Sequence, residues 1–332
     1  MATAPLEPIY DDPAVDTSPW VPPPTVKDHL GGTLPPESDF FVAPPGEIGK
    51  VKSAYTTLKK QDRPRPFWTR AAIAAIPVAV PAAVWVVGLA MDSFALSAFG
   101  AMFALLLLFL GMPFAWYATE FKHSCNFVGT EGCARFACKG KRETLSEKSI
   151  FRYQEAWALT TLITQTTRTN LLGRKIRGQT TFRFCWHAPQ SEKIVYQIAG
   201  QHPAPNNPYD FARAVEAAFN DYLLPRLEAE LASKGYISFY MGQGRWALVG
   251  RGVLEIVDPK GNRSRCEAAD IGSAQLAAGV FTITRKDATS KFFGLLGTTG
   301  VFSFGYYSLY NPRLFLFAFE RLLNIKVEYK AE

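Results

Sequence analysis

Two long uncharged stretches constrain this chain more than any other feature. No charged residue occurs from Ala71 to Met91, and after the polar pair Asp92-Ser93 none occurs from Phe94 to Thr119. As an α-helix the shorter stretch is about 31 Å long, which matches the hydrocarbon thickness of a bilayer. Because lipid offers backbone groups no hydrogen-bond partners, the two runs predict a helical hairpin across a membrane. One very long buried helix in a soluble core is the alternative, and its length disfavours it.

The predicted hairpin occupies residues 71–119, with spans at 71–91 and 94–118. Basic residues flank it on both sides, whereas the two residues between the spans include none. The excess of Lys and Arg marks the cytoplasmic side of a membrane protein. We therefore expect a multi-pass protein of the inner (plasma) membrane with both termini in the cytoplasm and Asp92 on the far side.

The basic flank before the hairpin forms a collar over residues 50–70, with seven Lys and Arg residues and one Asp. Basic side chains near a membrane surface attract anionic lipid headgroups, at about 1 kcal/mol for each residue. The candidate juxtamembrane residues are Lys59, Lys60, Arg63, Arg65, Arg70 and Lys122.

Small residues recur at a spacing of four in the second span, where Ser97 pairs with Ala101 and Gly100 with Ala104. Such a spacing allows two membrane helices to approach closely. The contact could be made with the other span or with another copy of the chain.

Residues 1–49 carry eight acidic side chains and one basic side chain, and 13 of the 23 prolines fall between Met1 and Pro66. Proline blocks helix and removes backbone donors, so we predict a disordered acidic tail with local polyproline II character. It is either a solvated spacer or a docking tail whose anchor is Trp20 or the pair Phe40-Phe41.

After the hairpin the pattern changes to short runs rich in β-branched and aromatic residues, which are typical of strands. They include an alternating run at Gly132–Lys139 and a longer run at Trp246–Val257, which a turn at Asp258–Asn262 is expected to follow. Asn207-Pro208 is expected to open a long helix that ends near Gly235, with a kink or the start of another helix at Pro225. Asn311-Pro312 is expected to open a further helix after another series of strands. Asn at the N-cap and Pro at the first helical position suit a helix start. The two helix starts share Asn, Pro, Phe, Ala and Glu in register, 104 residues apart, which favours an internal duplication.

The predicted fold class is thus a membrane-anchored α+β protein. Units of about 100 residues, in which six or seven strands precede one helix, resemble pleckstrin-homology-like (PH-like) barrels. The chain over residues 67–326 resembles bacterial membrane proteins that carry PH-like domains on a helical hairpin and whose biochemistry is mostly unassigned. The resemblance implies a tethered binding module with units at 120–235 and 236–326. One larger α+β domain is the alternative.

The sequence offers no catalytic, metal or cofactor signature. The five Cys contain no Cys-x-x-Cys pair, no Ser lies in a Gly-x-Ser-x-Gly turn, and no phosphate-binding loop is present. The Cys residues are expected to be buried thiols rather than zinc ligands. Residues 71–332 sum to a modest charge of +8, and their aromatic residues are interleaved with the expected strands as in a core, so nucleic acid is disfavoured as a partner.

The strongest binding candidate is a basic segment on a turn between two expected strands, with two leucines at its tip. It comprises Arg168, Leu171, Leu172, Arg174, Lys175 and Arg177. Arg suits phosphate geometrically, so this segment could meet an anionic headgroup. A solvated charged hairpin is an equally good interpretation.

Three hypotheses for the function follow. The first is a non-enzymatic scaffold or adaptor that binds a protein partner or anionic lipid at the cytoplasmic face. The second is a subunit of a transporter or envelope complex that packs through the hairpin, as a homo-oligomer or with other proteins. The third and weakest is an enzyme that acts on lipid-like substrates.

Overall fold

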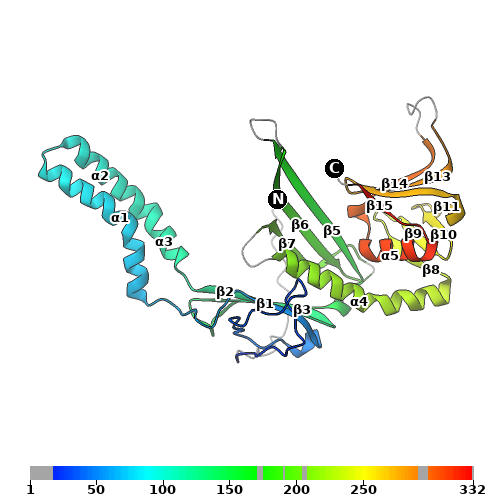
Figure 1. Cartoon of the computed structure of the whole chain (residues 1–332), viewed down its shortest axis with the longest axis horizontal. Coiled ribbons are helices and arrows are strands. Elements are labelled where there is room, and N and C mark those ends of the chain that lie inside the picture. The colour runs from blue at the N-terminus through cyan, green and yellow to red at the C-terminus, as the bar shows by residue number, and fades with distance from the viewer. Residues whose placement is uncertain (1–17, 170–174, 190, 204–207, 291–297, 331–332) are drawn as a thin grey trace.

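The chain folds into an α+β protein with two long apolar helices and several antiparallel sheets (Figure 1). The structure is a computed structural model, and it describes residues 18–169, 175–189, 191–203, 208–290 and 298–330. The helices and strands follow the chain in an order that places the apolar helices between the first and second strands.

The first apolar helix, α1 (Phe67–Ala90), turns back at Asp92 into a second helical stretch over Phe94–Ala118. Both helices are long and apolar enough to cross a membrane, and they project away from the rest of the molecule (Figure 1). The second stretch comprises α2 (Phe94–Leu106), a π-helical turn η2 (Leu107–Gly111) and α3 (Met112–Ala118). Pro113 lacks the N–H that would bond to the carbonyl four residues earlier, which accounts for the wider turn before it.

The part of the protein outside the hairpin, called the body below, consists of two units. The first unit begins before the hairpin rather than after it. Strand β1 (Val51–Thr56) pairs antiparallel with β2 (Lys122–Gly129), so that Thr56 lies opposite Cys125. The predicted boundary at residue 120 is therefore wrong, and part of the predicted collar is the first strand of the four-stranded sheet. The hairpin is an insertion between two neighbouring strands of one sheet.

The first unit contains two sheets and a helix. Four strands form a sheet in the order β1-β2-β3-β4, three form a second sheet in the order β5-β6-β7, and the helix α4 follows. The bounds of the remaining elements are β3 Gly132–Lys139, β4 Leu145–Arg152, β5 Ala158–Thr169, β6 Lys175–His187, β7 Ile194–His202 and α4 Pro208–Lys234. The helix α4 continues through Pro225 as one element, so no second helix starts there.

Residues 18–49 pack onto this first unit. Phe40, Phe41 and Val42 are fully buried, in a cluster with Phe127 and Phe136 of β2 and β3. The prediction of disorder is wrong for residues 18–49, because a short apolar run inside a proline-rich segment suffices to anchor it. Residues 1–17 lie outside the described part of the chain.

Polar contacts hold the same segment at two further places. Arg142 donates two hydrogen bonds to the carboxylate of Asp39, at 2.6 and 2.8 Å. Lys27 pairs in parallel with β1 at Ser53, which extends the edge of the four-stranded sheet. The pair Phe40-Phe41, considered above as an anchor for docking, thus packs on the chain's own four-stranded sheet.

The second unit repeats the order of the first: four strands, three strands and a helix. The four-stranded sheet has the order β11-β10-β9-β8, and the helix α5 (Pro312–Leu323) follows the three further strands. The strands are β8 Tyr236–Tyr240, β9 Trp246–Gly250, β10 Val253–Val257, β11 Arg263–Glu267, β12 Ile271–Ala277, β13 Val280–Ser290 and β14 Thr298–Gly305. A last strand, β15 (Glu328–Lys330), adds in parallel to β12.

One detail of the second unit differs from the sequence prediction and a second agrees with it. A single strand was expected over residues 246–257, but a turn at Arg251-Gly252 divides it into β9 and β10, with Gly252 at φ 73°. The expected turn at Asp258–Asn262 does connect β10 to β11, and it carries Gly261 at φ 84°.

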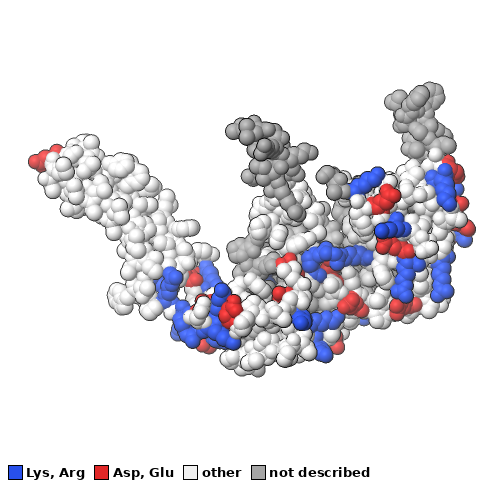
Figure 2. Space-filling view, in the orientation of Figure 1, with Lys and Arg blue, Asp and Glu red and all other residues white. Residues whose placement is uncertain are grey.

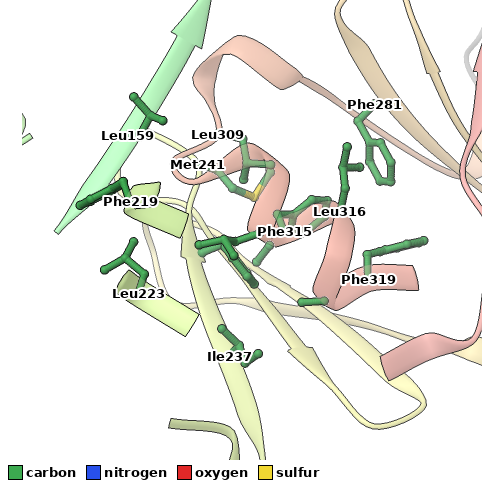
Figure 3. Close-up of a cluster of buried hydrophobic side chains, with 14 of the residues drawn as sticks. Leu159, Phe219, Leu223, Ile237, Met241, Phe281, Leu309, Phe315, Leu316 and Phe319 are labelled. Carbon is green, nitrogen blue, oxygen red and sulfur yellow. The ribbon is translucent and has the colours of Figure 1, made fainter. Parts of the chain in front are cut away.

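The two units share one hydrophobic core. Figure 3 shows Leu159 and Phe219 of the first unit in the same cluster as Met241 and Leu309 of the second. Phe315 of α5, also fully buried, packs edge-on against Phe239 and Phe281. The body is therefore held together across the unit boundary by apolar burial.

Asn311 joins the units through hydrogen bonds rather than by capping its own helix. It adopts a left-handed conformation with φ 54°, and its Oδ1 accepts a hydrogen bond from the backbone N–H of Leu159 at 2.9 Å. Its backbone N–H donates to the carbonyl of Leu159 at 2.7 Å. The expected N-cap role is wrong, because the side chain is used across the boundary; Asn207 lies outside the described residues.

Candidate functional site

The base of the hairpin, where both apolar helices enter the body, concentrates basic side chains. Residues 57–66 connect β1 to α1, and residues 119–121 connect α3 to β2. Figure 2 shows Lys and Arg gathered there, while the visible surface of the hairpin is uncharged except at its far tip, where Asp92 forms the turn. The fold thus brings together the two basic flanks, which the sequence separates by about 50 residues.

Arg70 is fixed at this base by the opposite helix. Its guanidinium carbon lies 4.2 Å from the ring centroid of Trp116, and Nη2 donates to the Trp116 carbonyl at 3.0 Å. A cation over an aromatic face is a favourable contact. Arg70 therefore joins the start of α1 to the end of α3.

Lys122 and Lys139 share one carboxylate at the same level. The carboxylate of Glu120 forms ion pairs with Nζ of Lys122, at 2.7 Å, and with Nζ of Lys139, at 3.4 Å. The hydrogen bond from Lys122 holds the pKa of Glu120 below its usual value. Lys122 also lies over the ring of Tyr117, with its Nζ 3.3 Å from the centroid.

The other predicted juxtamembrane residues lie on the connection between β1 and α1. Lys60 donates to the carbonyl of Pro36 at 2.7 Å, and the backbone N–H of Lys59 donates to Asp62 at 2.9 Å. Arg63 and Arg65 are exposed and line a shallow hollow with Glu120. The other residues around this hollow are Asp62, Ala118, Thr119, Phe121 and His123.

The small residues predicted for helix packing lie in the second apolar helix, and Gly100 meets the first. A Cβ at Gly100 would lie 2.5 Å from the backbone N of Trp85, so only glycine allows this approach. Gly88 makes the reciprocal contact with the backbone of Ser97. Ala101 and Ala104 are half-buried in the same helix. The contact at Gly100 thus lies within the chain's own hairpin.

The basic segment between β5 and β6 falls largely outside the described residues. Leu171, Leu172 and Arg174 are not described, and for Arg168, Lys175 and Arg177 only the backbone is. In the ladder Arg177 pairs with Thr167, and Lys175 with Thr169. Its role in binding stays a prediction.

The groups that could support chemistry are dispersed. All five Cys are free and buried, and burial raises the pKa of the Cys133 thiol to about 12. Among the described residues no group of three or more His, Cys, Asp or Glu side chains could hold a metal ion. The most perturbed carboxyl is Glu216, 2% exposed between the helices α4 and α5, whose burial raises its pKa to about 7. Its carboxylate forms ion pairs with Arg213 of the same helix and Arg313 of α5.

Neither a scan against known protein-family models nor a search of the curated proteins found a match for this chain.

Proposed function

We propose that this protein is a non-enzymatic membrane-anchored adaptor. Its hairpin spans the inner (plasma) membrane, and its two PH-like units bind a protein partner or anionic lipid at the cytoplasmic face. The repeated order of four strands, three strands and a closing helix supports the PH-like assignment. The exposure of both long helices supports the membrane assignment, because only 11% and 6% of their most apolar 18-residue stretches are buried.

One observation carries this proposal: the hairpin is inserted between the paired strands β1 and β2. Two separate chain connections, each short, therefore link the first unit to the spans. A body attached in this way would stay close to the membrane surface and keep one orientation toward it. Attachment by two short connections suits an adaptor that acts at the membrane surface, whereas a long flexible tether would suit an adaptor that acts away from it.

The distribution of charge supports the proposed topology. Lys and Arg gather at the body end of the hairpin, whereas the turn at the other end carries Asp92. Because Lys and Arg are enriched on the cytoplasmic side of membrane proteins, this excess supports a cytoplasmic location for the body end of the hairpin. Both termini would then be cytoplasmic, because β1 and β2 lie in the same sheet.

The anchoring is tested by replacing residues 63–119 with a short Gly-Ser linker. Asp62 and Glu120 line the same hollow, so a short linker can join the chain end at Asp62 to the chain end at Glu120. Strand β1 can then still pair with β2. We expect the full chain to remain in the membrane pellet after an alkaline wash. We expect the replacement variant to be soluble without detergent and to retain the circular dichroism of the body.

Release of the full chain by the alkaline wash would contradict the proposal. Pelleting of a folded replacement variant with the membranes would contradict the hairpin as the anchor. A fragment that starts at residue 125 is unsuitable for such tests, since it lacks β1 and the segment around Phe41.

A further inference from the structure

We propose that the hollow lined by Arg63, Arg65 and His123 binds the phosphate of an anionic phospholipid headgroup. This inference rests on the proposed membrane anchoring, and it assigns a specific lipid class to a specific place on the protein. The hollow opens at the base of the hairpin, between the β1–α1 connection and the start of β2.

The charges around the hollow leave its two arginines without a carboxylate. Glu120 is already paired with Lys122 and Lys139. The Oδ2 of Asp62 accepts a hydrogen bond from the backbone N–H of Lys59 at 2.9 Å. In the described part of the chain, neither Arg63 nor Arg65 forms an ion pair. An anion from outside the chain would therefore complete the site.

Arg63 is held in place by the backbone but retains donors for a ligand. Its Nη1 donates to the carbonyls of Lys60 at 2.9 Å and Asp62 at 3.0 Å. Within the described residues, Nε and Nη2 of Arg63 and the whole guanidinium of Arg65 form no hydrogen bond. Guanidinium groups bind phosphate oxygens through paired N–H donors, and the two carboxylates that line the hollow, Asp62 and Glu120, form no ion pair with these donors among the described residues.

The location of the hollow selects a lipid rather than a soluble anion. Ala118 and Thr119, at the end of the second apolar helix, form part of its wall. The rings of Trp116 and Tyr117 precede them, and aromatic rings of this kind mark the headgroup level of a membrane. A phosphate in the hollow would thus lie at the depth of the headgroups, with its acyl chains beside the apolar helices.

The test uses the full chain in phosphatidylcholine nanodiscs that contain a minority of phosphatidylglycerol. Native mass spectrometry would measure how many phosphatidylglycerol molecules the released protein retains. The variant Arg63→Gln/Arg65→Gln should weaken this retention about 30-fold, which corresponds to about 2 kcal/mol. The matched control Arg251→Gln/Lys260→Gln removes the same charge from exposed turns of the second unit and should retain the lipid as the unmodified chain does.

Two outcomes would overturn the inference. Equal retention by the Arg63/Arg65 variant and the unmodified chain would show that the hollow does not bind the headgroup. Calorimetric binding of inorganic phosphate to the detergent-solubilised chain, lost in the Arg63/Arg65 variant, would make it a site for free phosphate instead. If the full chain failed to enter nanodiscs at all, the membrane anchoring itself would be wrong, so the two failures are distinguishable.

Discussion

Replacement of Phe41 by alanine is expected to lower the free energy of unfolding of the body by about 3–5 kcal/mol. Phe41 is fully buried in the cluster formed by residues 18–58 with β2 and β3. Removal of the ring leaves a cavity in addition to the lost burial of apolar surface. An equivalent change in a disordered tail would cost nothing, so the size of the effect distinguishes the two descriptions of this segment.

Urea titration of the detergent-solubilised chain would measure the Phe41→Ala effect. Trp20 gives a local signal, because its ring lies 5.1 Å from that of Phe40 and 5.3 Å from that of Phe127. The control is Val21→Ala, since Val21 is 83% exposed in the same segment and its change should have little effect. Equal midpoints for the two variants would contradict the packing of this segment on the first unit.

The second large effect is expected for Asn311→Ala, at about 2–4 kcal/mol. The change removes the acceptor for the Leu159 N–H, which is buried and would be left without a partner. It also places alanine at φ 54°, a left-handed conformation that asparagine tolerates better than alanine does. Chemical denaturation of the full chain in detergent would measure the loss.

Asn324→Ala provides a matched control for the backbone effect alone. Asn324 has φ 58° at the end of the same helix, and its side chain is exposed. The difference between the two variants therefore measures the link between the units. Asn311→Asp, which keeps the Oδ1 acceptor, should restore part of the stability. If Asn311→Ala cost no more than Asn324→Ala, the hydrogen bond from the Leu159 N–H to the Asn311 side chain would contribute nothing to the stability of the body.

The elements with strong local patterns could be predicted from the sequence. The uncharged runs gave helices at 67–90 and 94–118, close to the expected spans of 71–91 and 94–118. The alternation at Gly132–Lys139 and the helix starts at Pro208 and Pro312 agree with the structure. Each of these signals is contained in a few neighbouring residues, because period and capping chemistry act locally.

Elements defined by distant partners could not be predicted in this way. The strand β1 is short and lies among lysines, and its partner β2 follows only after the whole hairpin. Proline content correctly argued against helix in residues 18–49, but it carries no information on whether Phe41 finds a surface to pack on. Asn311 was expected to cap its own helix, since a sequence cannot reveal a hydrogen-bond partner 152 positions away.

The candidate site likewise combines a feature that the sequence predicts with one that depends on distant partners. The excess of positive charge near the hairpin is visible in the sequence, but the pairing of these charges is not. The ion pairs of Glu120 with Lys122 and Lys139 depend on the β2–β3 ladder, in which Lys122 lies opposite Lys139. Among the described residues that line the hollow, this pairing leaves Arg63 and Arg65 available to a ligand.

The central claim, that the two apolar helices cross the membrane and return, is tested most directly at their connecting turn. All five native Cys are buried, so a single introduced Cys can be labelled selectively. A membrane-impermeant maleimide should label Asp92→Cys in intact cells, and should label Lys59→Cys, at the hairpin base, only after the membrane is permeabilised. Labelling of Lys59→Cys in intact cells, or protection of Asp92→Cys until permeabilisation, would contradict the account.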